Sequence, residues 1–410
     1  MPVPAFHLKL SGSDKDELLN AAIAANRKLG GRLRLLLTMN LPYDPALGGA
    51  NKANKAVVEQ LADLGHKVCI VAPAAPEHSV KTAPSTRKRP NLLVHNVDTK
   101  KEKLTVALKK CIQSFVPEII LVSSEDPVQA LLYEALKTPD AQVVYLVHSP
   151  NCLPFGPLSF FPSQRGTSLL ARVSLVIAVS EFAASYVEQW SSIRPERFYF
   201  PAYGLPPFAF MGSFAAPYIT MVNPSSYKGI DIFLRIAELR PHWEFMAIPS
   251  WGTTEEDLQR LASLPNIEIR EADVNIESAL AGTKILVVPS LFLENFSMVV
   301  VEALLRGIPV VASEVGGMRE AKLGTNHLIP VMPIRRFEKH LDQRGLLIAE
   351  VLPQDADPWL IALEQLCGDE RIFIGESELG RDRATDFVSR LSISGIEERL
   401  MRLIAMRCRQ

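Results

Sequence analysis

The sequence contains few cysteines, and none of them forms a metal or disulfide motif. Five cysteines are spread over 410 residues without a CxxC pair, at positions 69, 111, 152, 367 and 408. An odd number at wide spacing is typical of reduced, scattered thiols rather than of a zinc site or a disulfide framework. The acidic triplet DAD at 355–357 lies in a late loop, where we expect solvated side chains. We therefore predict no metal site.

A charge excess and long apolar runs are also missing. Lys and Arg number 44 against 45 for Asp and Glu, a formal net charge of -1, which argues against a general nucleic-acid binder. No run reaches the roughly 18 apolar residues of a membrane-spanning helix, and the start of the chain lacks the apolar core of a secretory signal. We expect a cytoplasmic protein. Peripheral contact with the inner membrane surface and the oligomeric state stay open.

The sequence does contain a repeated alternation of apolar strands and helices. With 48% hydrophobic residues, the chain has enough apolar side chains for a large core. Continuous apolar runs, separated by helical stretches such as 49–64, occur at LRLLLT (from 33), KVCIVA (from 67), IILVSS (from 119), VVYLVH (from 143) and SLVIAVS (from 174). Such runs predict a parallel sheet covered by helices on both faces, which is a Rossmann-like doubly wound domain.

The alternation stops in a connector rich in proline, glycine and aromatic residues, at 200–217, and then starts again. The second series of runs is YITMVN (218–223), WEFMAI (243–248), IEIREA (267–272), KILVVP (284–289) and PVVAS (309–313). The predicted parts are a helical extension (1–30, with a helix at 14–29), an N-terminal domain (31–207), a C-terminal domain (208–383) and a C-terminal helix (384–410, with helical periodicity at about 384–406). Because ligands bind beyond the carboxyl ends of parallel strands, two facing sheets would share one site in the cleft between them.

The most informative segment is PSLFLENFSMVVVEALLRGIPVVASEVGGMREA, at 289–321. Glu294 follows a strand end, and Glu302 comes eight positions later (302 − 294) inside a helix. Eight positions are about two helical turns, so the two carboxylates can reach two parts of one elongated ligand. The helix begins near Phe296, Ser297 and Met298. The backbone N–H groups of a helix N-terminus favour a diphosphate.

This segment resembles the E-x7-E signature of the retaining glycosyltransferases of family four, which have the GT-B fold. The pattern P-S-x-x-E-x-F, with one more residue before Glu294 in this chain, followed by E-A-x-x-x-G-x-P-V-V-A-S-x-x-G-G-x-x-E, matches almost throughout. The resemblance implies that Glu294 approaches hydroxyls of the donor sugar and that Glu302 holds the ribose. The family usually has glycine where Ser297 stands, and a side chain there narrows the pyrophosphate approach. Gly316 and Gly317 allow close approach of the backbone to a ligand.

The loop VNPSSYKGID, from Val222, resembles the phosphate loop of the same family. Lys228 matches the family's lysine, which neutralises the diphosphate and stabilises the leaving group. Asn223 stands at the strand end, beside the expected phosphate position. The arginine that is usual in this loop is absent, and Pro224 stands in its place. The charge compensation of the diphosphate is therefore less complete here than in the family.

Two features of the N-terminal half resemble the family's donor site from the opposite side of the cleft. Gly48 and Gly49 lie in the loop after the first strand, where the family places a glycine pair. The resemblance implies that their backbone closes over the diphosphate and the transferred sugar. His148 ends the run VVYLVH and resembles the histidine that contacts the donor sugar.

Together these features predict a glycosyltransferase of the hexosyltransferase type. The resemblance implies transfer with retention from a nucleotide-diphosphate sugar, by family frequency a UDP-sugar, to a glycan, lipid-linked or small-molecule acceptor. The candidate catalytic residues are Glu294, His148 and Lys228. The candidate donor-binding residues are Gly48, Gly49, Asn223, Phe296, Ser297, Met298 and Glu302. We expect no cofactor apart from the donor, and metal-independent transfer.

Two other functions stay open. A sugar-nucleotide epimerase of the same GT-B shape would convert the donor without using an acceptor. A non-catalytic protein would bind the nucleotide sugar and do no chemistry. The missing arginine of the phosphate loop and the side chain of Ser297 are the features that keep the binding protein open.

Overall fold

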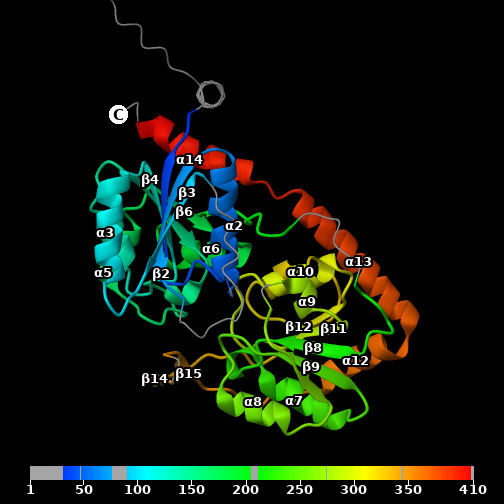
Figure 1. Ribbon diagram of the computed structural model, residues 1–410. Coiled ribbons are helices and arrows are strands. Elements are labelled where there is room, and N and C mark those ends of the chain that lie inside the picture. Colours follow the sequence, from blue (N-terminus) through cyan, green and yellow to red (C-terminus); the bar gives the residue numbers. More distant parts are fainter. Residues whose placement is uncertain are drawn as a thin grey trace, which may run out of the picture.

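The computed structural model describes residues 31–46, 48–75, 90–204, 211–273, 275–342 and 345–407. These residues form two domains, each built on a parallel β-sheet, and a long C-terminal helical segment that runs along both (Figure 1). The helix expected at 14–29 lies outside the described residues. The predicted fold class, two Rossmann-like doubly wound domains, is confirmed.

The N-terminal domain has a seven-stranded sheet in the order β3-β2-β1-β4-β5-β6-β7, in which every pairing is parallel. Its elements are β1 (Arg34–Thr38), α2 (Gly49–Asp63), β2 (Lys67–Pro73), β3 (Leu92–Val97), α3 (Leu104–Phe115), β4 (Ile119–Ser123), α4 (Ala130–Ala135), β5 (Gln142–Val147), η1 (Pro150–Cys152), α5 (Gln164–Leu170), β6 (Leu175–Ala178), α6 (Glu181–Trp190) and β7 (Glu196–Arg197). All five expected strands are present. They are found where the sequence predicts them because each is an apolar run buried on both faces, as the fully buried β4 shows.

The C-terminal domain repeats this order of strands in a six-stranded parallel sheet, β10-β9-β8-β11-β12-β13. Its elements are β8 (Tyr218–Val222), η2 (Ser226–Lys228), α7 (Ile230–Leu239), β9 (Glu244–Ile248), α8 (Glu255–Ala262), β10 (Ile267–Ile269), α9 (Ile276–Ala279), β11 (Thr283–Val288), α10 (Met298–Leu305), β12 (Val310–Ser313), α11 (Met318–Ala321), β13 (Leu328–Ile329), the hairpin β14 (Phe337–Leu341) and β15 (Leu347–Ala349), and α12 (Asp357–Gly368). In each sheet the strand order reverses direction between two central strands, β1 and β4 or β8 and β11. The crevice at such a reversal is where open α/β sheets bind ligands.

In the described part of the helical region expected at 384–410, the end of one helix is followed by a second helix. Helix α13 (Glu370–Ser389) packs on the C-terminal domain, and α14 (Ile393–Arg407) packs on the N-terminal domain (Figure 1). The helix is interrupted at 390–392 because the segments before and after this point bury apolar side chains in different cores. Ile396, Leu400 and Met401 of α14 join the core beneath β1. The last helix thereby ties the C-terminal end of the chain to the first domain.

Candidate functional site

The loops that follow the central strands of the C-terminal domain are tied together by backbone hydrogen bonds. The N–H of Gly317 donates to the carbonyl oxygen of Glu294 at 2.6 Å. Gly316 has a φ of 51°, and a Cβ atom on it would lie 2.3 Å from that same carbonyl oxygen. The close approach predicted for the glycine pair is therefore made to the chain's own backbone. Its effect is to fix the position of Glu294.

The phosphate loop is held against the same segment. The N–H groups of Leu291 and Phe292 both donate to the carbonyl oxygen of Tyr227 at 3.0 Å. Gly229 has a φ of 76°, and a Cβ atom there would lie 2.0 Å from the carbonyl oxygen of Pro289. These contacts require glycine and bring the two loops together side by side. The N–H of Lys228, the last residue of η2, donates to Ser225 at 3.0 Å.

Glu294 and Lys228, predicted from separate motifs, form one ion pair at this edge. Lys228 Nζ contacts Glu294 Oε1, and Ser290 Oγ donates to the same carboxylate oxygen at 2.7 Å. The Lys228 side chain is 20% exposed and the Glu294 side chain 13%. Partial burial reduces solvent screening of this pair, so each charge strongly orients the other. An anion that arrives beside Lys228 would therefore meet a cation already held in place.

Asn223 and Phe296 make contacts within the protein through their side chains. Asn223 has a φ of 60°, and its side-chain oxygen accepts from the N–H of Gly252 at 2.9 Å. Phe296 packs against Tyr199 and stacks on Phe387, with ring centroids 5.4 and 5.8 Å apart. Both side chains therefore brace the loops, and the Asn223 side-chain amide nitrogen and the backbone groups of both residues are the atoms left for the predicted role.

Two helix N-termini meet across the domain boundary. Helix α10 begins after Ser297 and α2 begins after Gly48, and neither has a side chain capping its first N–H groups. A Cβ atom on Gly49 would lie 3.5 Å from Met298 Sδ, which places the two helix starts in contact. Each helix N-terminus carries a partial positive charge and free N–H donors. The arrangement therefore favours an anion between the two domains.

Glu302 binds a lysine of the opposite domain. Lys52 Nζ, on the first turns of α2, lies 3.3 Å from Glu302 Oε1, and their side chains are 31% and 12% exposed. Sequence reasoning missed Lys52. The only local feature of the sequence that points to Lys52 is its position three residues after Gly49. Its partner, Glu302, lies 250 residues further along the chain.

A cavity of about 340 Å³ opens between the domains at this ion pair. It is lined by Ala46, Lys52, Lys55, Ala56, Glu59, Ala202, Tyr203, Gly204, Ile276, Glu302, Leu305 and Arg306. The Tyr203 hydroxyl is buried without a hydrogen-bond partner in the described part of the chain. Burial, with a smaller contribution from Glu302, raises the pKa of Tyr203 well above its usual value. The hydroxyl stays neutral and is an unused donor beside the cavity.

His148 lies at the carboxyl end of β5, as predicted, but it is 8% exposed and engaged inside its own domain. Its Nε2 lies 2.8 Å from Asn54 Oδ1, and the Asn54 amide nitrogen donates to Ser123 at 2.9 Å. Burial lowers the pKa of His148, and Glu125 offsets this effect only in part. The lowered pKa favours the neutral ring, and the tautomer in which Nε2 donates to the Asn54 oxygen leaves Nδ1 as an acceptor.

Glu320 joins the two domains at a second point. The α11 carboxylate accepts from the N–H of Glu181 at 2.8 and 3.1 Å and also binds the Tyr199 hydroxyl. Glu181 is the first residue of α6, so a C-terminal-domain carboxylate caps an N-terminal-domain helix. Ser180 caps the same helix, because its hydroxyl oxygen accepts from the N–H of Ala183.

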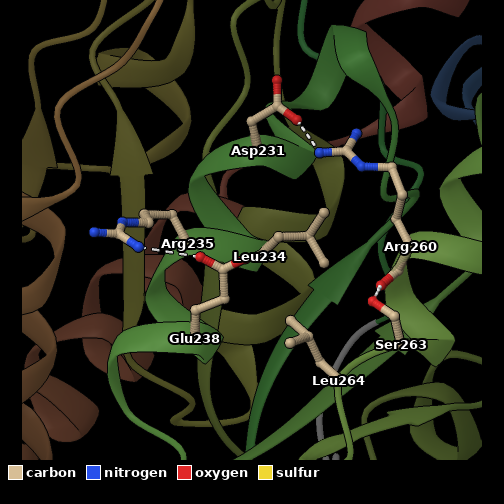
Figure 2. A pocket seen from close by; sticks show the side chains of 7 residues that line it. All are labelled: Asp231, Leu234, Arg235, Glu238, Arg260, Ser263 and Leu264. Atoms are coloured by element: carbon tan, nitrogen blue, oxygen red, sulfur yellow. Dashed lines mark hydrogen bonds and ion pairs between the residues drawn. The ribbon is translucent and has the colours of Figure 1, made fainter.

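A hollow of about 390 Å³ lies on the C-terminal domain between α7 and α8 (Figure 2). Its charged side chains face one another as pairs, Asp231 with Arg260 and Arg235 with Glu238. These pairs neutralise each other's charge, and the hollow contains none of the predicted site residues. Asp355 and Asp357 are exposed at the start of α12, in agreement with the expected solvated loop. No helix among the described residues has the length and apolar composition that crossing a membrane requires.

Both sides of this site match known glycosyltransferase sequences. Residues 47–200 match the family model described as Glycosyltransferase Family 4, and residues 216–341 match the model described as Glycosyl transferases group 1. A Klebsiella pneumoniae protein, described as an uncharacterized 42.6 kDa protein in the cps region, is 20% identical over 328 residues. The match covers 70% of this chain and 87% of that protein. The chain thus carries glycosyltransferase domains on both sides of the cleft.

Solved structures agree on the fold. Anabaena HepE in complex with UDP-glucose has a TM-score of 0.63 at 16% identity, and the match covers 92% of this chain and 100% of that one. A glycosyltransferase from Rickettsia africae has a TM-score of 0.58 at 15% identity, with 92% of this chain and 97% of that chain covered. The fold is that of the GT-B glycosyltransferases.

Proposed function

We propose that the protein is a retaining glycosyltransferase of the hexosyltransferase type that uses a nucleotide-diphosphate sugar. The observation that carries this proposal is the contact between two uncapped helix N-termini, of α2 and α10, together with the cation Lys52 on α2 and the Lys228–Glu294 ion pair in the C-terminal domain. Free N–H donors and two ammonium groups suit a diphosphate that lies between the domains. The glycosyltransferase domains on both sides of the cleft support the same substrate class.

A UDP-sugar is the proposed donor. HepE, which shares the fold, was crystallised with UDP-glucose and also with UDP and glucose. The acceptor in this proposal is a glycan, a lipid-linked sugar or a small molecule, because the N-terminal loops that would select it match no distinctive motif.

The proposed roles follow the positions of the charges. Lys228 neutralises the diphosphate as it leaves, Glu294 holds hydroxyls of the transferred sugar, and Glu302 holds the ribose. Lys52 exchanges its contact with Glu302 for the diphosphate and so supplies the cation that the missing loop arginine would provide. His148 accepts a hydrogen bond from a sugar hydroxyl through Nδ1, since Nε2–H is used by Asn54.

The transfer step in this proposal breaks the bond between the anomeric carbon and the diphosphate oxygen. The acceptor oxygen forms the new bond on the same face, and its proton passes to the leaving diphosphate. The electron pair of the broken bond leaves with the diphosphate, which the two lysines and the helix N-termini stabilise. No side chain serves as a covalent nucleophile.

Incubation of the protein with UDP-glucose and related donors tests the activity directly. Transfer, or slow release of UDP and free sugar with retained configuration, supports the proposal. Conversion of the donor into an epimer without UDP release would establish the epimerase instead. Binding without any turnover would establish a non-catalytic nucleotide-sugar protein.

We further propose that transfer is independent of a divalent cation at the donor site. In this proposal Lys228, Lys52 and the helix N-termini supply the positive charge that a cation would otherwise bring to the diphosphate. Transfer should therefore proceed at an unchanged rate in excess EDTA and gain nothing from Mg²⁺ or Mn²⁺. Complete loss in EDTA that Mg²⁺ or Mn²⁺ reverses would contradict this.

A further inference from the structure

Three side chains with metal-binding atoms converge in the N-terminal domain, on elements that the donor site does not use. They are Cys69 of β2, His95 of β3 and Cys111 of α3. One ligand atom from each, two sulfurs and an imidazole nitrogen, lies within 4.8 Å of the other two. Cys69 and Cys111 are buried, with 0% and 6% exposure, and His95 is half-buried.

The fold explains why these side chains meet. Cys69 pairs with Leu93 and Val71 pairs with His95 in the parallel register of β2 and β3. Paired residues of parallel strands point to the same face, and alternate residues share a face, so Cys69 and His95 lie on one side of the sheet. Helix α3 covers that side with its buried stripe of Leu104, Ala107, Leu108 and Cys111.

Two cysteine sulfurs and a histidine nitrogen are a ligand set that zinc prefers. Zinc bond lengths of about 2.0–2.3 Å in tetrahedral geometry place ligand atoms roughly 3.5–3.8 Å apart, so rotamer adjustments suffice to close the cluster. Burial raises the pKa of Cys69 to about 12, and the neighbouring Cys111 adds to this effect. Burial also raises the pKa of Cys111. Without a cation both thiols are neutral, and a bound divalent cation reverses this preference.

The His95 ring favours a ligand role over simple packing. It makes no hydrogen bond, ion pair or ring contact with the rest of the described chain, although it is half-buried beside two thiols. It lies on β3, an edge strand of the sheet among the described residues, and its half-burial leaves part of the ring exposed. A metal ion bound there would find an imidazole without a competing partner and an open position for water.

We propose that Cys69, His95 and Cys111 bind one zinc ion, with water as the fourth ligand at the edge of the sheet. Binding releases the two thiol protons to solvent and forms two zinc–sulfur bonds and one zinc–nitrogen bond. The ion fastens the edge strand β3 to β2 and α3. The separations, 26 residues (95 − 69) and 16 residues (111 − 95), match no short motif, which is why the sequence predicts no zinc site. The proposal is independent of the donor site.

Metal analysis of the purified full chain tests this proposal. The protein is prepared with Zn²⁺ and a reductant, desalted, and its zinc content measured by mass spectrometry. The metal-free protein is then titrated with Co²⁺, whose thiolate charge-transfer absorption reports sulfur ligands. Cys111→Ser and His95→Ala are the test variants. Cys152→Ser and Cys367→Ser are matched controls, because these free cysteines lie outside the cluster.

The wild type and both control variants should hold one zinc ion per chain and show the cobalt–thiolate absorption. Cys111→Ser should lose most of that absorption, and His95→Ala should keep it while binding Co²⁺ at least about tenfold more weakly. A wild type with no stoichiometric zinc and no cobalt–thiolate absorption overturns the proposal and leaves a reduced, apolar cysteine pair. Equal loss in a control variant overturns it as well. The wild-type zinc content and cobalt–thiolate absorption alone decide whether the chain binds the metal through sulfur. A variant that fails to fold therefore does not obscure the result.

Discussion

The two domains share one strand order, yet they present different chemistry at the cleft. The C-terminal domain presents a braced edge, where Gly229, Gly316 and Gly317 press against neighbouring backbone and hold Lys228 and Glu294 as an ion pair. The N-terminal domain presents an open glycine pair and a neutral, buried histidine. The same sheet topology thus supports one half-site that is braced around an ion pair and another that offers a glycine pair for close approach.

This difference indicates a division of labour in the proposed reaction. The diphosphate requires fixed positive charge and N–H donors, which the C-terminal loops hold before any ligand arrives. The sugar and the acceptor require room for a backbone to approach, which Gly48 and Gly49 provide. Lys52 is the exception, because it is an N-terminal-domain cation that reaches Glu302 across the boundary.

Substitution of Lys228, the cation held by Glu294, should have the largest effect on transfer. Lys228→Ala removes the charge that stabilises the leaving diphosphate and leaves the Glu294 carboxylate, 13% exposed, without its partner. We expect kcat to fall about 10²–10³-fold, the range typical for losing one preorganised electrostatic contact. Steady-state transfer assays with saturating donor measure this. Lys101→Ala, at an 85% exposed side chain of the other domain, is the control that should leave kcat unchanged.

The braced and open glycines should respond differently to a methyl group. A Cβ atom at Gly317 would lie 2.0 Å from the Asn295 carbonyl oxygen, whereas at Gly49 it would meet Met298 Sδ at 3.5 Å. Gly317→Ala should destabilise the C-terminal domain by about 1–3 kcal/mol, as overpacking does, and displace Glu294. Gly49→Ala should fold normally and weaken only donor binding. Thermal unfolding and nucleotide titration separate the two outcomes.

Gly324→Ala is the control that measures the cost of placing alanine at a positive φ without a steric clash. Gly324 has a φ of +81°, and no atom lies within 4 Å of a Cβ placed on it. Its substitution therefore costs only the left-handed conformation, about 1 kcal/mol. If Gly317→Ala costs no more than Gly324→Ala and transfer is unchanged, the loop bracing does not matter to the site.

The sequence predicts the charged half-site better than the open one, for a physical reason. Lys228 and Glu294 belong to local motifs at the ends of buried strands, and the parallel sheet brings such ends together. Lys52 and Asn54 depend on partners 250 and 94 residues away, which no local pattern specifies. His148 was placed correctly at its strand end, but its bond to Asn54 follows only from packing.

The strands follow the same rule. Runs buried on both faces, such as β4, are continuous apolar segments and can be predicted. Strand β3 mixes half-buried and exposed positions with one buried residue, Val97, and β7 consists of two exposed charged residues. Both lie at the edges of the sheet, and neither is a continuous buried apolar run. The β14–β15 hairpin was likewise not predicted, because it forms a separate antiparallel pair.

Removal of the Glu302 carboxylate, which is proposed to hold the ribose, should have a smaller effect on the enzyme than loss of Lys228. Glu302→Ala removes charge-assisted hydrogen bonds and should lower UDP affinity by about 1.5–3 kcal/mol, roughly 10–150-fold. Lys52→Ala should weaken UDP binding less, because Lys52 must first leave Glu302. Calorimetric titration of both variants and of the double variant measures their coupling. Unchanged affinity in Glu302→Ala would sink the assignment, and Glu238→Ala, at a 49% exposed surface pair, serves as control.

The smallest expected effect concerns how the two half-sites come together. Glu320 caps α6 across the boundary, a carboxylate–helix contact worth about 0.3–1 kcal/mol when exposed. Glu320→Ala should therefore shift the population of closed molecules up to about fivefold without affecting either sheet. Small-angle scattering should show a larger radius of gyration for this variant than for the wild type or for Glu314→Ala, whose carboxylate pairs with Arg319 inside one domain.

Ligands should restore the closed form of Glu320→Ala to different extents, the intact donor more than UDP. In the proposed site UDP would contact mainly the C-terminal domain, so it should reduce the radius of gyration of Glu320→Ala only partly. The intact donor adds a sugar that reaches the glycine pair, and a ligand favours the closed form only by its differential affinity for it. Donor should therefore close the variant more completely than UDP does. If Glu320→Ala has the same radius of gyration as the wild type and neither ligand changes it, the two domains do not open and close relative to each other. The cleft is then fixed with both half-sites already assembled.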